Sequence, residues 1–276
     1  MSTTWLSEIF PTSKPVVGML HAPPLPGSPG YGGDLRAVRE AVLRDAEAMV
    51  ESGIHGLVLE NFGDAPFWPR RVPAEVVAQM TALAVEIGRR FPVPLGINVL
   101  RNDGRSALAV AQAAGARFVR VNVLCGARLT DQGILEGIAA KLLRDRARLR
   151  ADIKILADVD VKHSAPLASR PLEEEAEETL QRGGADGLVV SGPGTGKPAD
   201  PRKLRAVRKA ARGAPVFVGS GISAENVGEY LPWADGFLVG TWLKRDGSVT
   251  APVDPSTDAA MSSSVGGLPS KLWRRS

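Results

Sequence analysis

The sequence has only one cysteine, Cys125, and no long apolar run. A single cysteine excludes an intramolecular disulfide and is typical of a reducing compartment, so we expect a cytoplasmic protein. No apolar stretch approaches the ~20 residues that a membrane-spanning helix needs, so no transmembrane segment is expected. The net charge is only +4 and the Lys and Arg residues are dispersed, which argues against nucleic acid as a partner.

Aromatic residues are also scarce, with 7 Phe, 5 Trp and 2 Tyr in 276 residues. Val, Ile, Leu and Ala must therefore fill the core, and a hydrophobic content of 44% is enough for a large one. A single domain over residues 1–260 fits this length. Residues 261–276 have linker composition, rich in Ser and Gly, and are expected to be a disordered tail.

Short apolar runs alternate with helical segments along the chain. This alternation predicts parallel strands connected by helices. Eight such strands are expected, at Val16–Leu20, Gly56–Glu60, Pro94–Leu100, Phe118–Val123, Ile153–Asp160, Gly187–Ser191, Pro215–Val218 and Gly236–Val239. An open doubly wound sheet has the same alternation, but no dinucleotide-type Gly-x-Gly-x-x-Gly turn follows the first strand. The favoured fold class is therefore a closed (β/α)8 TIM barrel.

Polar side chains occupy one face of several predicted strands. In the fifth strand Lys154, Leu156, Asp158, Asp160 and Lys162 share the face expected to point into the barrel, because side chains alternate along a strand. By the same alternation the inward positions of the third and fourth strands include the polar residues Asn98, Arg120 and Asn122. Such residues gather near the carboxyl ends of the strands, where barrel active sites lie. This coincidence favours an enzyme.

Several roles remain open for these residues. Arg120 and Asp158 lie on neighbouring strands and form either a buried ion pair or part of the catalytic machinery. His21 follows the first strand, where it could be a general acid or base, a metal ligand or a residue pinned by the proline-rich loop. Of Glu60 and Asn61, only one is expected to point inward. No cofactor is required, but a divalent cation could be held by His21, Glu60, Asp158 and Asp160.

Small residues end the last two strands in tight turns. The turns after strands seven and eight commonly hold a phosphate group in such barrels. The expected phosphate-binding residues are Gly192, Gly219, Ser220, Gly221, Gly240 and Thr241. The segment Gly192–Pro198 departs from the P-loop pattern at two positions, so it is interpreted as a flexible loop that brings Thr195 and Lys197 near an anionic ligand.

Several stretches together resemble the BtpA/SgcQ family. They include Val17-Gly-Met-Leu-His-Ala-Pro-Pro-Leu-Pro-Gly-Ser-Pro29, Gly96-Ile-Asn-Val-Leu-Arg-Asn-Asp103 and Ala157-Asp-Val-Asp-Val-Lys-His163, within a match over about residues 14–258. The resemblance implies a TIM barrel of the ribulose-phosphate-binding type. The family name refers to photosystem I biogenesis and to a sugar-metabolism gene cluster. A final helix is also implied, but residues 256–264 are poor helix formers.

Two functions follow as hypotheses. The first is an isomerase, lyase or aldol-type enzyme that acts on a phosphorylated sugar or a nucleotide-derived phosphate. Its acid/base residues would be Asp158, Asp160, His21, Lys162 and Glu60, with Asn98 and Asn122 orienting hydroxyl groups. The second is a non-catalytic accessory protein for the biogenesis of a membrane complex of the photosystem I type. A small phosphorylated ligand is the expected partner, and a homo-oligomer is possible.

Overall fold

The computed structural model describes residues 5–254, which form a closed barrel of eight parallel strands. Around the barrel the order is β1-β11-β10-β9-β7-β4-β3-β2, so every strand pairs with the next barrel strand in the chain and β1 closes on β11. The strands are β1 (Val16–His21), β2 (Gly56–Glu60), β3 (Leu95–Asn98), β4 (Phe118–Val121), β7 (Lys154–Val159), β9 (Gly187–Val190), β10 (Val216–Val218) and β11 (Gly236–Val239). The predicted fold class is confirmed.

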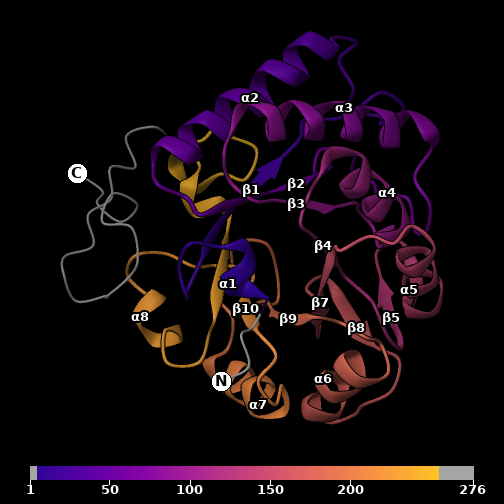
Figure 1. The fold of residues 1–276 in the computed structure, drawn as a ribbon, viewed down its shortest axis with the longest axis vertical. Helices are drawn as coiled ribbons and strands as arrows, with labels where there is room; N and C mark the ends of the chain where they lie inside the picture. The colour runs from indigo at the N-terminus through magenta and orange to yellow at the C-terminus, as the bar shows by residue number, and fades with distance from the viewer. Residues whose placement is uncertain (1–4, 255–276) are drawn as a thin grey trace.

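Helices surround the barrel, as Figure 1 shows. They are α2 (Leu35–Glu51), α3 (Ala74–Arg90), α4 (Gly104–Ala114), α5 (Ala139–Arg148), α6 (Leu172–Gln181), α7 (Pro201–Ala210) and the short α8 (Val227–Tyr230). Aspartates begin three of them: the side chains of Asp34, Asp103 and Asp200 accept hydrogen bonds from backbone N–H groups of the first turn. Gly115 ends α4 in the left-handed conformation that an L-residue adopts only with strain.

An apolar plug fills the amino end of the barrel. Helix α1 (Leu6–Ile9) lies across the centre of the ring of strands in Figure 1. Its residues pack with inward side chains of the barrel strands, and the ring of Phe10 meets Phe118 at 6.0 Å between centroids. Gly96 leaves room for Phe118, because a Cβ at position 96 would lie 2.3 Å from the Phe118 ring. The layer of side chains beneath the polar end of the barrel is therefore apolar.

The alternation of strand faces follows the predicted pattern. Ile155, Ala157 and Val159 of β7 belong to the large core between barrel and helices, whereas Leu156 belongs to the inner cluster. Asp158 lies on the inward face as expected. The inward and outward faces of this strand were therefore predicted correctly as far as Val159, its last residue.

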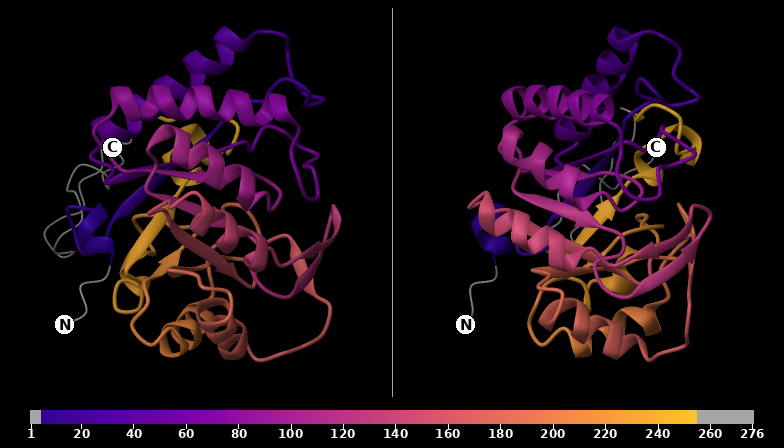
Figure 2. Two further views of the ribbon diagram at one scale, coloured as in Figure 1. Left: turned by 45° about the vertical axis from the view of Figure 1, so that its right-hand side comes forward. Right: turned by 90° about the vertical axis from the view of Figure 1, so that its right-hand side faces the viewer.

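A three-stranded antiparallel sheet sits at the carboxyl end of the barrel and was not predicted. It comprises β5 (Ala127–Thr130), β6 (Gly133–Glu136) and β8 (Ser164–Pro166), in the order β6-β5-β8. The sequence pattern predicts a basic helix from Gly133 to about Arg150, but β6 occupies the start of this segment and α5 begins at Ala139. The right-hand view of Figure 2 places α1 and this sheet at opposite ends of the barrel.

After β11 the chain forms two short 3-10 helices, η1 (Thr241–Leu243) and η2 (Arg245–Gly247). Lys244 is buried and forms an ion pair with Asp45 of α2, which fastens this segment beside the first helix of the ring. The expected difficulty with a final helix after Pro255 and the expected disordered tail at 261–276 both fall outside the described residues.

Candidate active site

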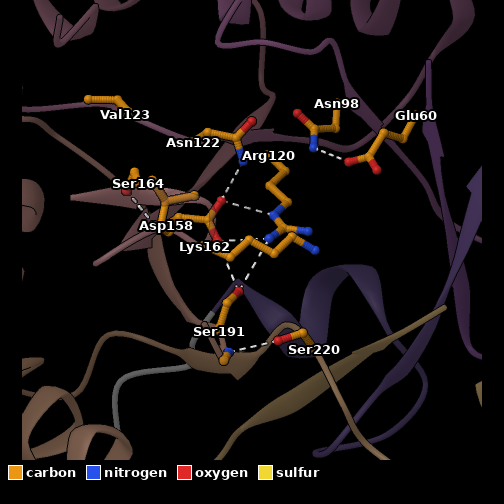
Figure 3. A network of polar contacts seen from close by, with 12 residues as sticks. Glu60, Asn98, Arg120, Asn122, Val123, Asp158, Lys162, Ser164, Ser191 and Ser220 are labelled. Carbon is orange, nitrogen blue, oxygen red and sulfur yellow. Dashed lines mark hydrogen bonds and ion pairs between the residues drawn. The ribbon is translucent and has the colours of Figure 1, made fainter. Parts of the chain in front are cut away.

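A buried ion pair forms the base of the polar end of the barrel. Arg120 donates to both carboxylate oxygens of Asp158, at 3.0 and 2.8 Å, and Asn122 Nδ2 donates to Asp158 Oδ2 at 2.8 Å. Ser191 Oγ lies 3.4 Å from Asp158 Oδ1. The Asp158 side chain is 0% exposed. Figure 3 shows these residues converging from adjacent strands. Of the two roles left open for Asp158, its geometry is that of the ion pair. Arg120 is the member of this pair that lines the cavity.

Glu60 points inward from the end of β2, beside the ion pair. Its Oε2 accepts a hydrogen bond from Asn98 on β3. Its Oε1 lies 3.7 Å from Nε2 of His21, whose ring stacks on Phe62 with centroids 4.5 Å apart. Asn61, the next residue, turns away and holds the backbone of Leu100. Glu60 is therefore the one of the two that faces inward.

A cavity of about 500 Å³ lies above this polar floor. Its wall combines groups from five barrel strands or the loops that follow them. The residues that line it are Glu60, Phe62, Phe67, Leu100, Arg101, Arg120, Asn122, Asp131, Lys162, His163 and Thr195. This volume is in the range of small-molecule binding sites.

Two polar atoms beside the cavity are buried and have no hydrogen-bond partner. They are Nε of Arg101 and Oδ1 of Asn122. Leaving such a group unpaired costs about 1–3 kcal/mol, so these atoms mark places where a ligand would supply the missing bonds. One is a cationic donor and the other a neutral acceptor, a combination that suits an anionic group next to a hydroxyl.

The charges around the floor are unevenly matched. The cations Arg101, Arg120 and Lys162 face the carboxylates of Glu60 and Asp158, and Arg120 is already paired. Among the described residues, no carboxylate lies within 4.0 Å of Lys162 Nζ or of the Arg101 guanidinium. Burial, with Arg120 as a further contributor, lowers the pKa of Lys162 to about 8.

His21 is enclosed and neutral near physiological pH. Burial first, and then the positive charges of Lys244 and Lys162, lower the pKa of His21 to about 3. The unfolded chain would bind a proton at this histidine below about pH 6.5 while the folded protein would not. Stability contributed by neutral His21 is therefore present above that pH and lost as the pH falls towards 3.

We expect the His21→Gln variant to be less sensitive to acid than the wild type. Between about pH 7 and pH 5, the wild type should lose about 2 kcal/mol more free energy of unfolding than the variant, because only the wild type has this histidine to protonate on unfolding. Urea unfolding at several pH values measures the difference. Parallel pH curves for the two proteins would show that His21 is not held neutral.

Asp160 does not reach the cavity. Strand β7 ends at Val159, and Asp160 has a positive φ of 51°, which takes its side chain out of the strand alternation. Its carboxylate pairs instead with Arg128 of β5 and Lys203 of α7. The expected inward orientation of Asp160 is therefore wrong, because the alternation was extended one residue beyond the strand, and the residue lies at the rim instead.

The predicted phosphate-binding residues lie together but behind a loop. The segment Gly192–Pro198 covers the turn after β10, where a Cβ at Gly221 would lie 2.3 Å from the Lys197 carbonyl carbon. Ser220 Oγ accepts from the backbone N–H of Gly192 at 2.7 Å and donates to the Lys197 carbonyl at 3.1 Å. The backbone N–H of Gly219 donates a hydrogen bond to the Val190 carbonyl within the barrel. None of Gly219, Ser220, Gly221, Gly240 and Thr241 lines the cavity.

Arg101 and Phe62 are cavity residues that sequence reasoning did not single out, whereas Phe67 belongs to a Phe67–Pro69 segment interpreted from the sequence as a lid, a dimer contact or a loop packed on the barrel rim. Arg101 stands in the loop after β3, where its guanidinium donates to the Lys162 carbonyl at 2.7 Å. A charged residue directly after a buried strand is the signal that could have identified it. Phe62 and Phe67 meet edge to face at 6.4 Å and form an apolar part of the wall. No comparable sequence signal marks Phe62.

Residues 5–254 lack two features of other classes of protein. No group of three or more His, Cys, Asp or Glu side chains is arranged to share a metal ion in this part of the chain. No helix within it combines the length and apolar character that crossing a bilayer requires.

Fold and site together define a class of protein: an eight-stranded α/β barrel with a polar cavity at the carboxyl ends of its strands. The sequence model of the BtpA family matches residues 12–265, and the chain belongs to that family. A Synechocystis protein named "Photosystem I biogenesis protein BtpA" is 44% identical, covering 96% of this chain and 93% of the relative. An uncharacterised Thermococcus kodakarensis protein is 49% identical, with 86% and 89% covered, and a Caenorhabditis elegans protein is 32% identical, with 88% and 90% covered.

Solved structures share the fold at low sequence identity. An archaeal fructose 1,6-bisphosphate aldolase has a TM-score of 0.53 and 15% identity, covering 90% of this chain and 93% of the aldolase. Phosphoribosyl anthranilate isomerase from Thermus thermophilus has a TM-score of 0.51 and 14% identity, with 86% and 92% covered. These similarities establish the barrel fold and leave the chemistry to be argued from the site.

Proposed function

We propose that the protein is an enzyme that performs acid/base chemistry, as an isomerase or lyase, on a small phosphorylated sugar or a nucleotide-derived phosphate. The observation that carries the proposal is a pair of unpartnered buried atoms at one cavity, Arg101 Nε and Asn122 Oδ1, beside the Lys162 side chain that also lines it. A purely structural network would leave fewer costly buried groups without partners.

Glu60 is the proposed general acid/base. It lines the cavity, its Oε2 is oriented by Asn98, and its Oε1 faces the His21 ring at the longer distance of 3.7 Å. A carboxylate held by a neutral amide and open on one side can exchange a proton with a bound molecule. Asn122 would orient a ligand hydroxyl through its free Oδ1. Asp158 acts through Arg120, whose guanidinium it holds in place.

Arg101 is the proposed contact for the anionic group of the ligand. Its planar guanidinium suits phosphate or carboxylate oxygens, and its Nε lacks a partner. Burial lowers the pKa of Arg101, yet a guanidinium remains charged at any ordinary pH. The turns at Gly219–Gly221 and Gly240–Thr241 are a second proposed place for phosphate, which requires the Gly192–Pro198 loop to move off them.

Removing the Arg101 charge should weaken binding of a phosphorylated ligand. A hydrogen bond to a charged group contributes about 1.5–3 kcal/mol, so Arg101→Met should raise the dissociation constant by about 10- to 100-fold. The ligand comes first from a thermal-shift screen of sugar phosphates, since a ligand at 100 times its dissociation constant stabilises by ~2.7 kcal/mol. Calorimetry then measures the affinities.

Two controls accompany this measurement. Arg70→Met changes an exposed arginine outside the cavity and should leave affinity unchanged. The unphosphorylated sugar should bind weakly to the wild type. Equal affinities in the wild type and Arg101→Met would remove Arg101 from the site, and the Ser220→Ala variant, which loosens the Gly192–Pro198 loop, would then test the glycine turns.

The alternative function is a non-catalytic accessory role in the biogenesis of a membrane complex. The name of the Synechocystis relative favours it. Relatives of comparable identity in an archaeon, and a more distant one in a nematode, indicate that the family extends beyond photosynthetic organisms, which favours a more general activity. Turnover that depends on Glu60 would distinguish the two functions.

A further inference from the structure

Lys162 is a half-buried lysine that forms none of the ion pairs of the barrel in the described part of the chain. It stands three residues beyond the end of β7, and the Arg101 guanidinium fixes its backbone carbonyl. Its side chain runs along the cavity floor beside Arg120 and Asp158, as Figure 3 shows. The lysine is thus held by its backbone while its amine reaches the cavity.

The neighbours of this amine favour its neutral form. Arg101 and Arg120 oppose its charge, and the two carboxylates that favour it, Glu60 and Asp158, are held by other residues. His21 and His163 also lie nearby, and burial lowers the pKa of each, so neither supplies a negative charge. A neutral amine is a nucleophile, whereas an ammonium group is not.

We propose that Lys162 forms an imine with the carbonyl carbon of the substrate, which the proposed function places in the same cavity. If Lys162 only anchored an anion, its place beside two arginines would be unfavourable, because their positive charges repel an ammonium group. Arg101 would hold the anionic group while Lys162 reacts with the carbonyl group. The substrate class thereby narrows to phosphorylated aldehydes and ketones.

The step balances without an oxidant or reductant. The lysine nitrogen adds to the carbonyl carbon, and the electron pair of the C=O double bond moves to oxygen. That oxygen takes one proton from the attacking nitrogen and a second from solvent, relayed by Glu60, and leaves as water. The C=N bond that forms keeps one hydrogen on nitrogen and carries a positive charge. This charge withdraws electrons from the neighbouring carbon, which promotes proton removal or C–C cleavage there.

Pyridoxal 5′-phosphate is a suitable probe because it combines an aldehyde with a phosphate group. The full chain is incubated with the probe and then treated with borohydride, which delivers hydride to the imine carbon and makes the bond permanent. Peptide mass spectrometry locates the reduced adduct. We expect Lys162 to be labelled first, with a rate that rises with pH to a midpoint near 8, as its lowered pKa dictates.

A matched pair of variants isolates the residue. Lys209 is exposed on α7 and lies outside the cavity, so it should react more slowly than Lys162. Lys162→Arg keeps the positive charge and should lose the fast label, whereas Lys209→Arg should keep it. A fast label that persists in Lys162→Arg, or a Lys162 in the wild type that is labelled no faster than Lys209, with the proteins folded by circular dichroism, would overturn the proposal.

The same trapping separates this proposal from the function on which it rests. If a sugar phosphate stabilises the protein but leaves no adduct on Lys162 after borohydride, the imine is excluded and the phosphate-binding function stands. If Lys162 is labelled rapidly by pyridoxal phosphate while no sugar phosphate binds, the reactive amine stands and the proposed substrate class is wrong.

Discussion

Asp158→Asn is expected to lower the free energy of unfolding by about 3–5 kcal/mol, although it removes no volume from the barrel. The substitution leaves the Arg120 guanidinium, which is almost fully buried, without its counter-charge. An uncompensated charge is costly there because the inner cluster below it is apolar. Urea unfolding followed by circular dichroism measures the change.

Asp160→Asn is the matched control. Its carboxylate is also paired with basic side chains, but it is 28% exposed and its partner Lys203 is 48% exposed. Its other partner, Arg128, is buried but keeps Glu175 as a counter-charge at 3.4 Å. Solvent screens such a pair, so the expected loss is no more than about 1 kcal/mol. Comparable losses in the two variants would contradict the distinction between a structural ion pair at the floor and a rim contact.

Glu60→Gln is expected to lower kcat by about 10²- to 10⁴-fold on a substrate identified by the ligand screen, because proton transfer by a positioned side chain contributes that much. Glutamine keeps the shape and can still accept the hydrogen bond from Asn98, so stability should change little. Steady-state kinetics with separate kcat and KM values test this expectation.

Glu40→Gln, a change on the exposed surface of α2, provides the control and should leave kcat unaltered. If Glu60→Gln turns over substrate at the wild-type rate, Glu60 has no acid/base role. If Glu60→Gln binds the phosphorylated ligand as tightly as the wild type but turns it over slowly, the loss belongs to the transition state.

The regular part of this fold was readable from the sequence because strand periodicity is a local property. Leu156 and Asp158 point inward and Ala157 outward, as alternation requires. Asn98 and Asn122 reach the same polar end for the same reason. Parallel strands align their carboxyl ends, so local patterns were enough to predict where polar residues would gather.

The remainder depends on contacts between distant segments. The hairpin of β5 and β6 is short, and pairing with β8 completes a three-stranded sheet, none of which the local pattern reveals. Because the backbone at Asp160 is left-handed, the alternation of inward and outward side chains ends one residue before the predicted end of the strand. The covering of Gly221 by Lys197 and Pro198 joins residues more than twenty positions apart. Sequence reasoning could find the glycine turn but not what packs against it.

The apolar plug formed by α1 has a consequence for the order of events in the cavity. Leu6, Ile9 and Phe10 fill the amino end of the barrel, so in the described part of the chain a ligand can approach the floor only from the loops at the other end. Because the cavity then has a single entrance, molecules bind and leave through the same opening. The molecule that binds first lies deepest and leaves last. For a reaction that joins or splits two molecules, this geometry imposes ordered binding and release. The molecule nearest Lys162 and Arg120 binds first and leaves last.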